Sequence, residues 1–164
     1  MLLMAEFRIR FINSGNSFVG RSIDWVTNSL MDHVEIVTDA GWYLGARSSG
    51  GVKSRPPDYC KPTWERRYAI PCTDEQHKKI MDYAYSKVGT KYNFGDIAGL
   101  LFRNRRFNSP SKLICSEFVI NAGQLAGGIM LLNVKVPYYS YLVTPEMLHL
   151  SPVLSGHCYY KYAA

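Results

Sequence analysis

The stretch that decides the fold reads Leu113-Ile114-Cys115-Ser116-Glu117-Phe118-Val119-Ile120. Two apolar residues lead into a cysteine, and the apolar run after it is suited to a buried helix. We therefore expect Cys115 in the first turn of a helix, with Ser116 in the same turn as a residue that lines the site. The unpaired N–H groups and the positive dipole end of a helix favour a thiolate over a thiol there. A nucleophilic thiolate would need a base from elsewhere in the chain.

The best candidate for that base lies upstream, in the stretch Asp32-His33-Val34-Glu35-Ile36-Val37. A strand over residues 33–38 would bury Val34 and Ile36 and leave His33 and Glu35 together on the opposite, accessible face. Same-side neighbours on a strand lie about 7 Å apart, so these two side chains can meet. Glu35 would then fix the His33 tautomer and stabilise its imidazolium, while the free ring nitrogen takes the proton of Cys115.

Composition is consistent with one globular domain over residues 1–164. The apolar share of 47% and the aromatic share of 13% are enough for a core and argue against disorder. The four cysteines are scattered, and none has the spacing of a zinc site. We expect Cys60, Cys72 and Cys158 to be small buried hydrophobes, and we expect no metal and no cofactor.

The net charge of +6 suits an anionic partner or simply a solvated basic surface. A nucleic-acid partner would rest on charge alone and is not expected. No apolar run approaches the length of a transmembrane helix, and the N-terminus lacks the pattern of a secretory signal. The expected location is the cytoplasm, or a virion if a phage encodes the chain. The sequence does not indicate an oligomeric state.

Apolar and turn patterns predict an α+β arrangement along the chain. Strands are expected over residues 6–12, 33–38, 42–47, 52–54, 64–70 and 157–162. Thr73 and Gln76 form a capping box at the start of a helix whose Ile80, Ala84 and Val88 share one face, with Gly89 as its C-terminal cap. Further helices are expected over 17–30, 96–102, 115–125 and 146–150, with a basic loop over 103–112.

The order of these motifs resembles a known superfamily. A histidine strand is followed by Trp42-Tyr43-Leu44-Gly45-Ala46-Arg47, by Gly89-Thr90-Lys91-Tyr92-Asn93, by the cysteine stretch and by Pro145-Glu146-Met147-Leu148. This order is similar to the permuted branch of the NlpC/P60 papain-like cysteine hydrolases, which includes YiiX-like proteins and, distantly, the lecithin:retinol acyltransferase group. The resemblance implies a circularly permuted papain-like fold, with an antiparallel sheet packed against the helix that bears the nucleophile.

The resemblance also implies roles for individual residues. Cys115 resembles the nucleophile, and its own N–H would help to form the oxyanion hole. His33 resembles the general base, and Tyr92 resembles a tyrosine that lines the site and donates to the oxyanion. Many relatives carry a polar residue on the strand after the histidine, whereas here that strand reads Tyr43-Leu44-Gly45-Ala46, with no suitable residue unless Arg47 serves. Glu35 is therefore our candidate for orienting His33, with a backbone carbonyl or water as the alternative.

Two classes of function follow. The favoured one is a cysteine hydrolase that cleaves an amide bond, with a peptidoglycan-type peptide as the leading substrate and a lipid-acyl hydrolase or transferase second. The alternative is a non-catalytic binding or structural module on the same fold, such as a phage virion or tail component. The missing polar residue on the strand after the hairpin turn favours this alternative.

Overall fold

The computed structural model describes residues 4–14, 30–93 and 112–163. The helices expected over 17–30 and 96–102 and the basic loop over 103–112 lie outside these residues, apart from Leu30 and Lys112. No helix within the described ranges combines the length and the apolar character that a membrane crossing requires.

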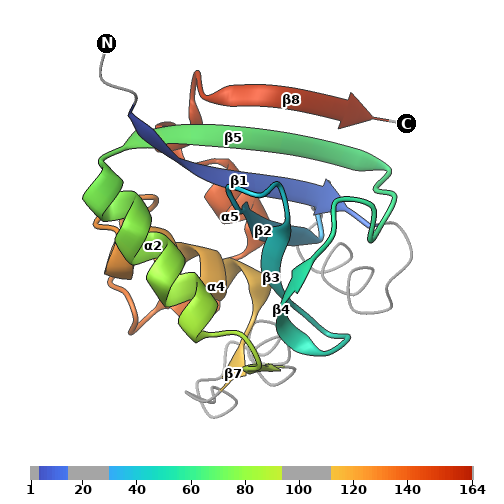
Figure 1. Cartoon of the computed structure of the whole chain (residues 1–164), viewed down its shortest axis with the longest axis horizontal. Coiled ribbons are helices and arrows are strands. Elements are labelled where there is room, and N and C mark those ends of the chain that lie inside the picture. Colours follow the sequence, from blue (N-terminus) through green and yellow to red (C-terminus); the bar gives the residue numbers. More distant parts are fainter. Residues whose placement is uncertain (1–3, 15–29, 94–111, 164) are drawn as a thin grey trace.

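A six-stranded antiparallel sheet forms the centre of the structure (Figure 1). Its strands lie in the order β4-β3-β2-β1-β5-β8, so β1 and β2 occupy the middle. Their bounds are β1 Ala5–Asn13, β2 His33–Val37, β3 Tyr43–Arg47, β4 Gly51–Arg55, β5 Trp64–Cys72 and β8 Cys158–Ala163. Each expected strand is confirmed within two residues at either end. A short parallel pair, β6 (Lys91–Tyr92) and β7 (Lys112–Leu113), leads into the cysteine stretch.

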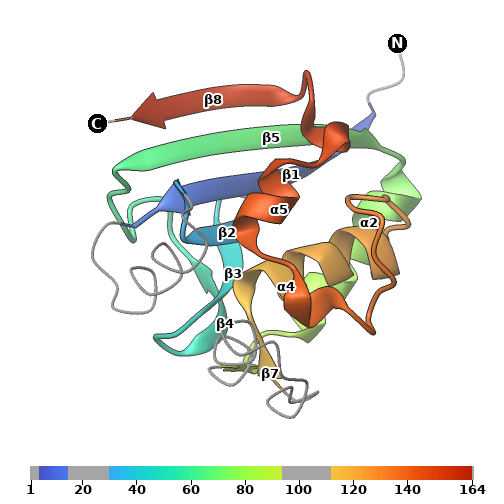
Figure 2. The same cartoon turned by 180° about the vertical axis from the view of Figure 1, so that it is seen from behind.

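The helices cover one face of this sheet (Figure 2). They are α2 (Asp74–Ser86), α4 (Cys115–Ile120), the π-helix η2 (Asn121–Ala126) and α5 (Pro145–His149), with 3-10 turns η3 (Ser140–Leu142) and η4 (Pro152–Leu154). Thr73 and Gln76 form the expected capping box at the start of α2. Ile80 and Ala84 are buried as expected, but Val88 is largely exposed because α2 ends at Ser86, before Gly89.

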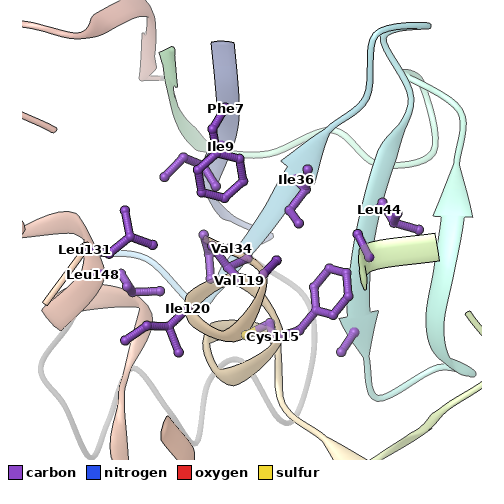
Figure 3. Packing of buried hydrophobic residues seen from close by; sticks show 14 of the residues in the cluster. Phe7, Ile9, Val34, Ile36, Leu44, Cys115, Val119, Ile120, Leu131 and Leu148 are labelled. Atoms are coloured by element: carbon purple, nitrogen blue, oxygen red, sulfur yellow. The ribbon is translucent and has the colours of Figure 1, made fainter. Parts of the chain in front are cut away.

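The hydrophobic core lies between the sheet and these helices (Figure 3). Alternation along the strands supplies one side of it, with Phe7 and Ile9 from β1 and Val34 and Ile36 from β2. Val119 of α4 packs against them, and every residue of α4 is buried. The first residue of this helix, Cys115, is therefore held in place by the core itself.

The central helix changes character after its first turns. An α-helix was expected over 115–125, but from Asn121 the chain continues as a π-helix. Gly123 is needed in this segment, because a methyl group there would lie 2.8 Å from both Leu131 Cδ1 and Phe7 Cε1. The helix thus packs closely on β1, which fixes the position of α4 on the sheet.

Candidate active site

Cys115 is the first residue of α4 and is only 3% exposed. The residue before it, Ile114, has an extended backbone and offers no side-chain cap to the helix. The first helical hydrogen bond runs from the N–H of Phe118 to the carbonyl of Ile114, at 3.0 Å. The N–H groups of the preceding turn have no partner within the helix, so this turn can stabilise negative charge beside the sulfur.

His33 links this cysteine to the sheet. It is the first residue of β2, and Cys115 and Glu35 both lie close enough to its ring to raise its pKa. Its Nε2 lies 3.2 Å from Oε2 of Glu35. The structure thus brings together the three residues that the sequence nominated as nucleophile, base and orienting carboxylate. The contact between His33 and Glu35, predicted from strand alternation, is confirmed.

The expectation that His33 and Glu35 lie on an accessible face of β2 is wrong. All five residues of β2 are buried, with His33 5% and Glu35 0% exposed. The reason is that the polar face of the sheet is also covered, by the side chains of neighbouring strands and by Tyr59 from the segment after β4. Glu35 is therefore a fully buried carboxylate, and it needs partners other than water.

Two of those partners were missed by sequence reasoning. Arg10 of β1 lies directly opposite Glu35 in the sheet and donates from Nη1 to Glu35 Oε1 at 2.8 Å. Tyr59 donates its hydroxyl to Glu35 Oε2 at 2.8 Å, the same oxygen that faces His33. Alternation along β1 puts Arg10 on the face opposite Phe7 and Ile9, but its pairing with β2 depends on the strand register, which the sequence does not give.

The pKa values of the pair reflect these contacts. Burial of His33 lowers its pKa, but hydrogen bonds to Cys115 and Glu35 outweigh burial, so the pKa of His33 is raised. Burial of Glu35 raises its pKa, but His33, Arg10 and Tyr59 outweigh burial and bring it down to about 2. The arrangement therefore favours a charged imidazolium beside an ionised carboxylate.

The two other nominated residues occupy different places. Tyr92 is buried in β6, directly paired with Leu113, two residues before Cys115. It therefore flanks the entry to the cysteine helix. The hydroxyl of Ser116 donates to the carbonyl of Val143, and the side chain is fully buried. Ser116 thus ties α4 to the chain segment that follows η3.

The structure defines a mixed α and β protein with a six-stranded antiparallel sheet. Comparison with protein-family models finds no match, and no curated protein matches the sequence. Among solved structures, the fold is similar to that of the metalloprotein yiiX from Escherichia coli O157:H7, DUF1105. The TM-score is 0.72 at 18% sequence identity, and the alignment covers 98% of this chain and 99% of that chain. The YiiX-like part of the resemblance is confirmed at the level of the fold.

That neighbour is described as a metalloprotein, which raises the question whether this site fits a metal ion. Within residues 4–14, 30–93 and 112–163, no group of three or more His, Cys, Asp or Glu side chains is placed to hold one. Both oxygens of Glu35 already accept hydrogen bonds, and the guanidinium of Arg10 stands beside them. A further cation at this carboxylate would be repelled, so the residues present do not fit a metal ligand set.

Proposed function

We propose that the protein is a cysteine hydrolase in which Cys115 is the nucleophile, His33 the general base and Glu35 the residue that orients His33. The observation that carries the proposal is the 3.2 Å contact between His33 Nε2 and Glu35 Oε2, on a histidine whose pKa is raised by both Cys115 and Glu35. A cysteine at a helix start, a histidine in contact with it and a carboxylate behind the histidine form the arrangement of a base-assisted thiol nucleophile. The resemblance to permuted NlpC/P60 papain-like enzymes supports the same roles.

The reaction proceeds in two steps. The Cys115 thiolate attacks the carbonyl carbon of an amide, and the oxyanion is stabilised by N–H groups of the first turn of α4 and by Tyr92. The C–N bond breaks, the amine leaves with the proton of the His33 imidazolium, and a thioester remains on Cys115. His33 then takes a proton from water, which attacks the thioester and releases a carboxylic acid and the free thiol.

The favoured substrate is a peptidoglycan-type peptide. This assignment comes from the superfamily resemblance, and the basic net charge of +6 is consistent with an anionic polymer as partner. The test is incubation of a cell-wall peptide with the protein and with a Cys115→Ala variant. We expect the protein to release the amine product and the variant to release none. Equal turnover by both proteins would contradict the assignment of Cys115.

Thiol reactivity tests the same site without a substrate. Cys60 and Cys158 are more exposed than Cys115, and Cys72 is buried, where burial raises the pKa of its thiol. We expect iodoacetamide to modify Cys115 fastest near neutral pH, at least about tenfold faster than Cys72. Since Cys115 is less accessible than Cys60, faster reaction would come from its thiolate character. A rate no greater than those of the other three thiols would favour a non-catalytic module.

A further inference from the structure

Each oxygen of the Glu35 carboxylate is held by a donor that comes from a different part of the chain. Oε1 accepts from Arg10 on β1, and Oε2 accepts from Tyr59 on the segment between β4 and β5. Neither donor is in the predicted catalytic series, and neither lies near Glu35 in the sequence. The orientation of the carboxylate is therefore fixed from outside the strand that carries it.

Arg10 is itself fixed on its far side. Its Nε and Nη2 donate to the two oxygens of Glu65 at 2.7 and 3.0 Å, and Glu65 also accepts from Arg67 at 2.5 Å. The guanidinium stacks over the ring of Tyr43, with its central carbon 4.0 Å from the ring centroid. Arg10 is 1% exposed, so its charge is balanced by the two glutamates rather than by water.

Tyr59 is anchored in the same way. Its hydroxyl accepts from Nη1 of Arg47 at 2.7 Å while it donates to Glu35. Its ring packs against that of Tyr43 in an edge-on contact. Burial and the neighbouring charge of Glu35 raise the pKa of Tyr59 above its usual range, so the hydroxyl keeps its proton and remains a donor. Its proton therefore always points at the oxygen that faces His33.

These contacts explain how the Glu35 carboxylate stays ionised and oriented although it is buried. A carboxylate without water either picks up a proton or turns toward whatever donor is nearest, and in both cases it stops supporting an imidazolium. Here Arg10 keeps the Glu35 carboxylate ionised, and Tyr59 keeps its Oε2 oriented toward His33. Within the described residues, the charged and titratable groups that interact with Glu35 or with its direct partners are Arg10, His33, Tyr43, Arg47, Arg55, Tyr59, Cys60, Glu65, Arg67 and, through His33, Cys115.

We propose that Arg10 and Tyr59 are positioning residues for the site, which hold the Glu35 carboxylate ionised and aimed at His33 and so extend the pH range over which the His33 imidazolium persists beside Cys115. This inference rests on the proposed function. It gives the segment between β4 and β5 a role in positioning the site, because the hydroxyl of Tyr59 acts on His33 through Glu35.

The test is the alkylation rate of Cys115 as a function of pH, read by mass spectrometry of the cysteine peptide, in the full chain and in Tyr59→Phe. The substitution removes one oxygen and leaves the ring in its contact with Tyr43. Without the hydroxyl, Glu35 turns away from His33 and the imidazolium loses counter-charge. The fall of the alkylation rate at alkaline pH, which we call the alkaline limb of the profile, then moves to lower pH. We expect the rate at neutral pH to fall about fivefold, in keeping with the loss of one hydrogen bond to a charged group.

The matched control is Tyr85→Phe, which removes the same atom from an exposed tyrosine on α2. Its profile should superimpose on that of the unmodified chain. A second variant, Arg10→Lys, keeps the positive charge but cannot donate to both glutamates with one planar group, and it should shift the limb further. If Arg10→Lys fails to fold, Tyr59→Phe alone decides.

The outcomes separate the two proposals. If Cys115 of the unmodified chain reacts no faster than Cys60, Cys72 and Cys158, the hydrolase proposal fails. If it reacts faster and Tyr59→Phe leaves its profile unchanged or broadens it, the hydrolase proposal stands and the positioning role is wrong. The ring resonances of His33 give an independent reading, because the pKa of His33 should fall in Tyr59→Phe and not in Tyr85→Phe.

Discussion

At the scale of single residues, Glu35 is the group on which the site and its stability both depend. Its folded pKa of about 2 lies below the value of about 4.3 for an unfolded glutamate. The ionised carboxylate therefore stabilises the fold above pH ~4.3, and this contribution disappears as the pH falls toward 2. The shift corresponds to about 3 kcal/mol at neutral pH.

Glu35→Gln should remove this contribution. We expect a loss of about 3 kcal/mol in the free energy of unfolding at pH 7, and a smaller change of stability between pH 5 and 2 than in the unmodified chain. Urea denaturation at several pH values measures both. Glu6→Gln is the control, because Glu6 forms an exposed ion pair with Arg8 and should change stability by less than ~0.5 kcal/mol. Parallel pH curves for Glu35→Gln and the unmodified chain would contradict the argument.

The contribution of His33 has the opposite pH dependence. Its pKa is raised in the folded chain, so its stabilisation is complete below the unfolded value of about 6.5 and is lost as the pH rises through the folded value. Between pH 5 and the unfolded value of His33, Glu35 and His33 both carry their charges. We expect the stability of the fold to be greatest in this range.

Sequence reasoning reached some of these residues and missed others for a physical reason. Period-two alternation is local, so His33 and Glu35 could be placed side by side from their spacing alone. The pairing of Arg10 with Glu35 is set by the register of two strands with a long connection between them. Tyr59 lies in a proline-rich segment without periodicity, and only the tertiary structure brings it to Glu35.

At the scale of elements, the close approach of β3 to β2 is the feature on which the site depends. A methyl group on Gly45 would lie 2.8 Å from Cβ of Glu35. Gly45 lies on the strand where the resemblance led us to expect a polar residue, and the space beside it is taken by Glu35. β3 thus has no room for a larger side chain at this position, because the carboxylate-bearing side chain of Glu35 on β2 occupies the space.

Gly45→Ala should therefore disturb both the fold and the site. We expect it to lower the free energy of unfolding by about 1–3 kcal/mol. We also expect the alkaline limb of Cys115 alkylation to move to lower pH, because Glu35 must move away from His33. Gly127→Ala is the matched control, since its added methyl group overlaps Ile80 of α2 instead. It should destabilise to a similar extent and leave the alkylation profile in place. A profile that shifts equally in both variants would show general loosening rather than a displaced Glu35.

The elements themselves follow largely from local patterns. Alternation marked the strands, and the Thr73 and Gln76 capping box marked the start of α2. The π-helix after Ile120 was not foreseen, because the sequence of η2 does not oppose an α-helix. Within this segment Gly123 lies close to Leu131 and Phe7, a tertiary contact that local sequence patterns do not give.

At the scale of the whole molecule, the sheet places the site far from one of its edges. β8 pairs only with β5, and β1 lies between β5 and the strand that carries His33. Most residues of β8 are exposed, and Cys158 at its start packs against the core. The edge strand and the site are therefore separate parts of the fold.

Removal of residues 158–164 should leave the protein folded but uncover the edge of β5. Its backbone groups from Trp64 to Tyr68 would lose their partners, and exposed edges pair with other chains. We expect a rise in molar mass by sedimentation and an unchanged pH profile of Cys115 alkylation. Tyr162→Ser, a change at an exposed position within the intact strand, should alter neither. Unfolding of the shortened chain would show that β8 is part of the core.

The series from Arg67 through Glu65 and Arg10 to Glu35 runs across three adjacent strands. Its consequence concerns transfer of the site to another scaffold. Copying Cys115, His33 and Glu35 alone would carry over a nucleophile and leave its electrostatic support behind. The smallest portable unit is β2 with its neighbours β1 and β5, together with Tyr59 and the first turn of α4 that carries Cys115.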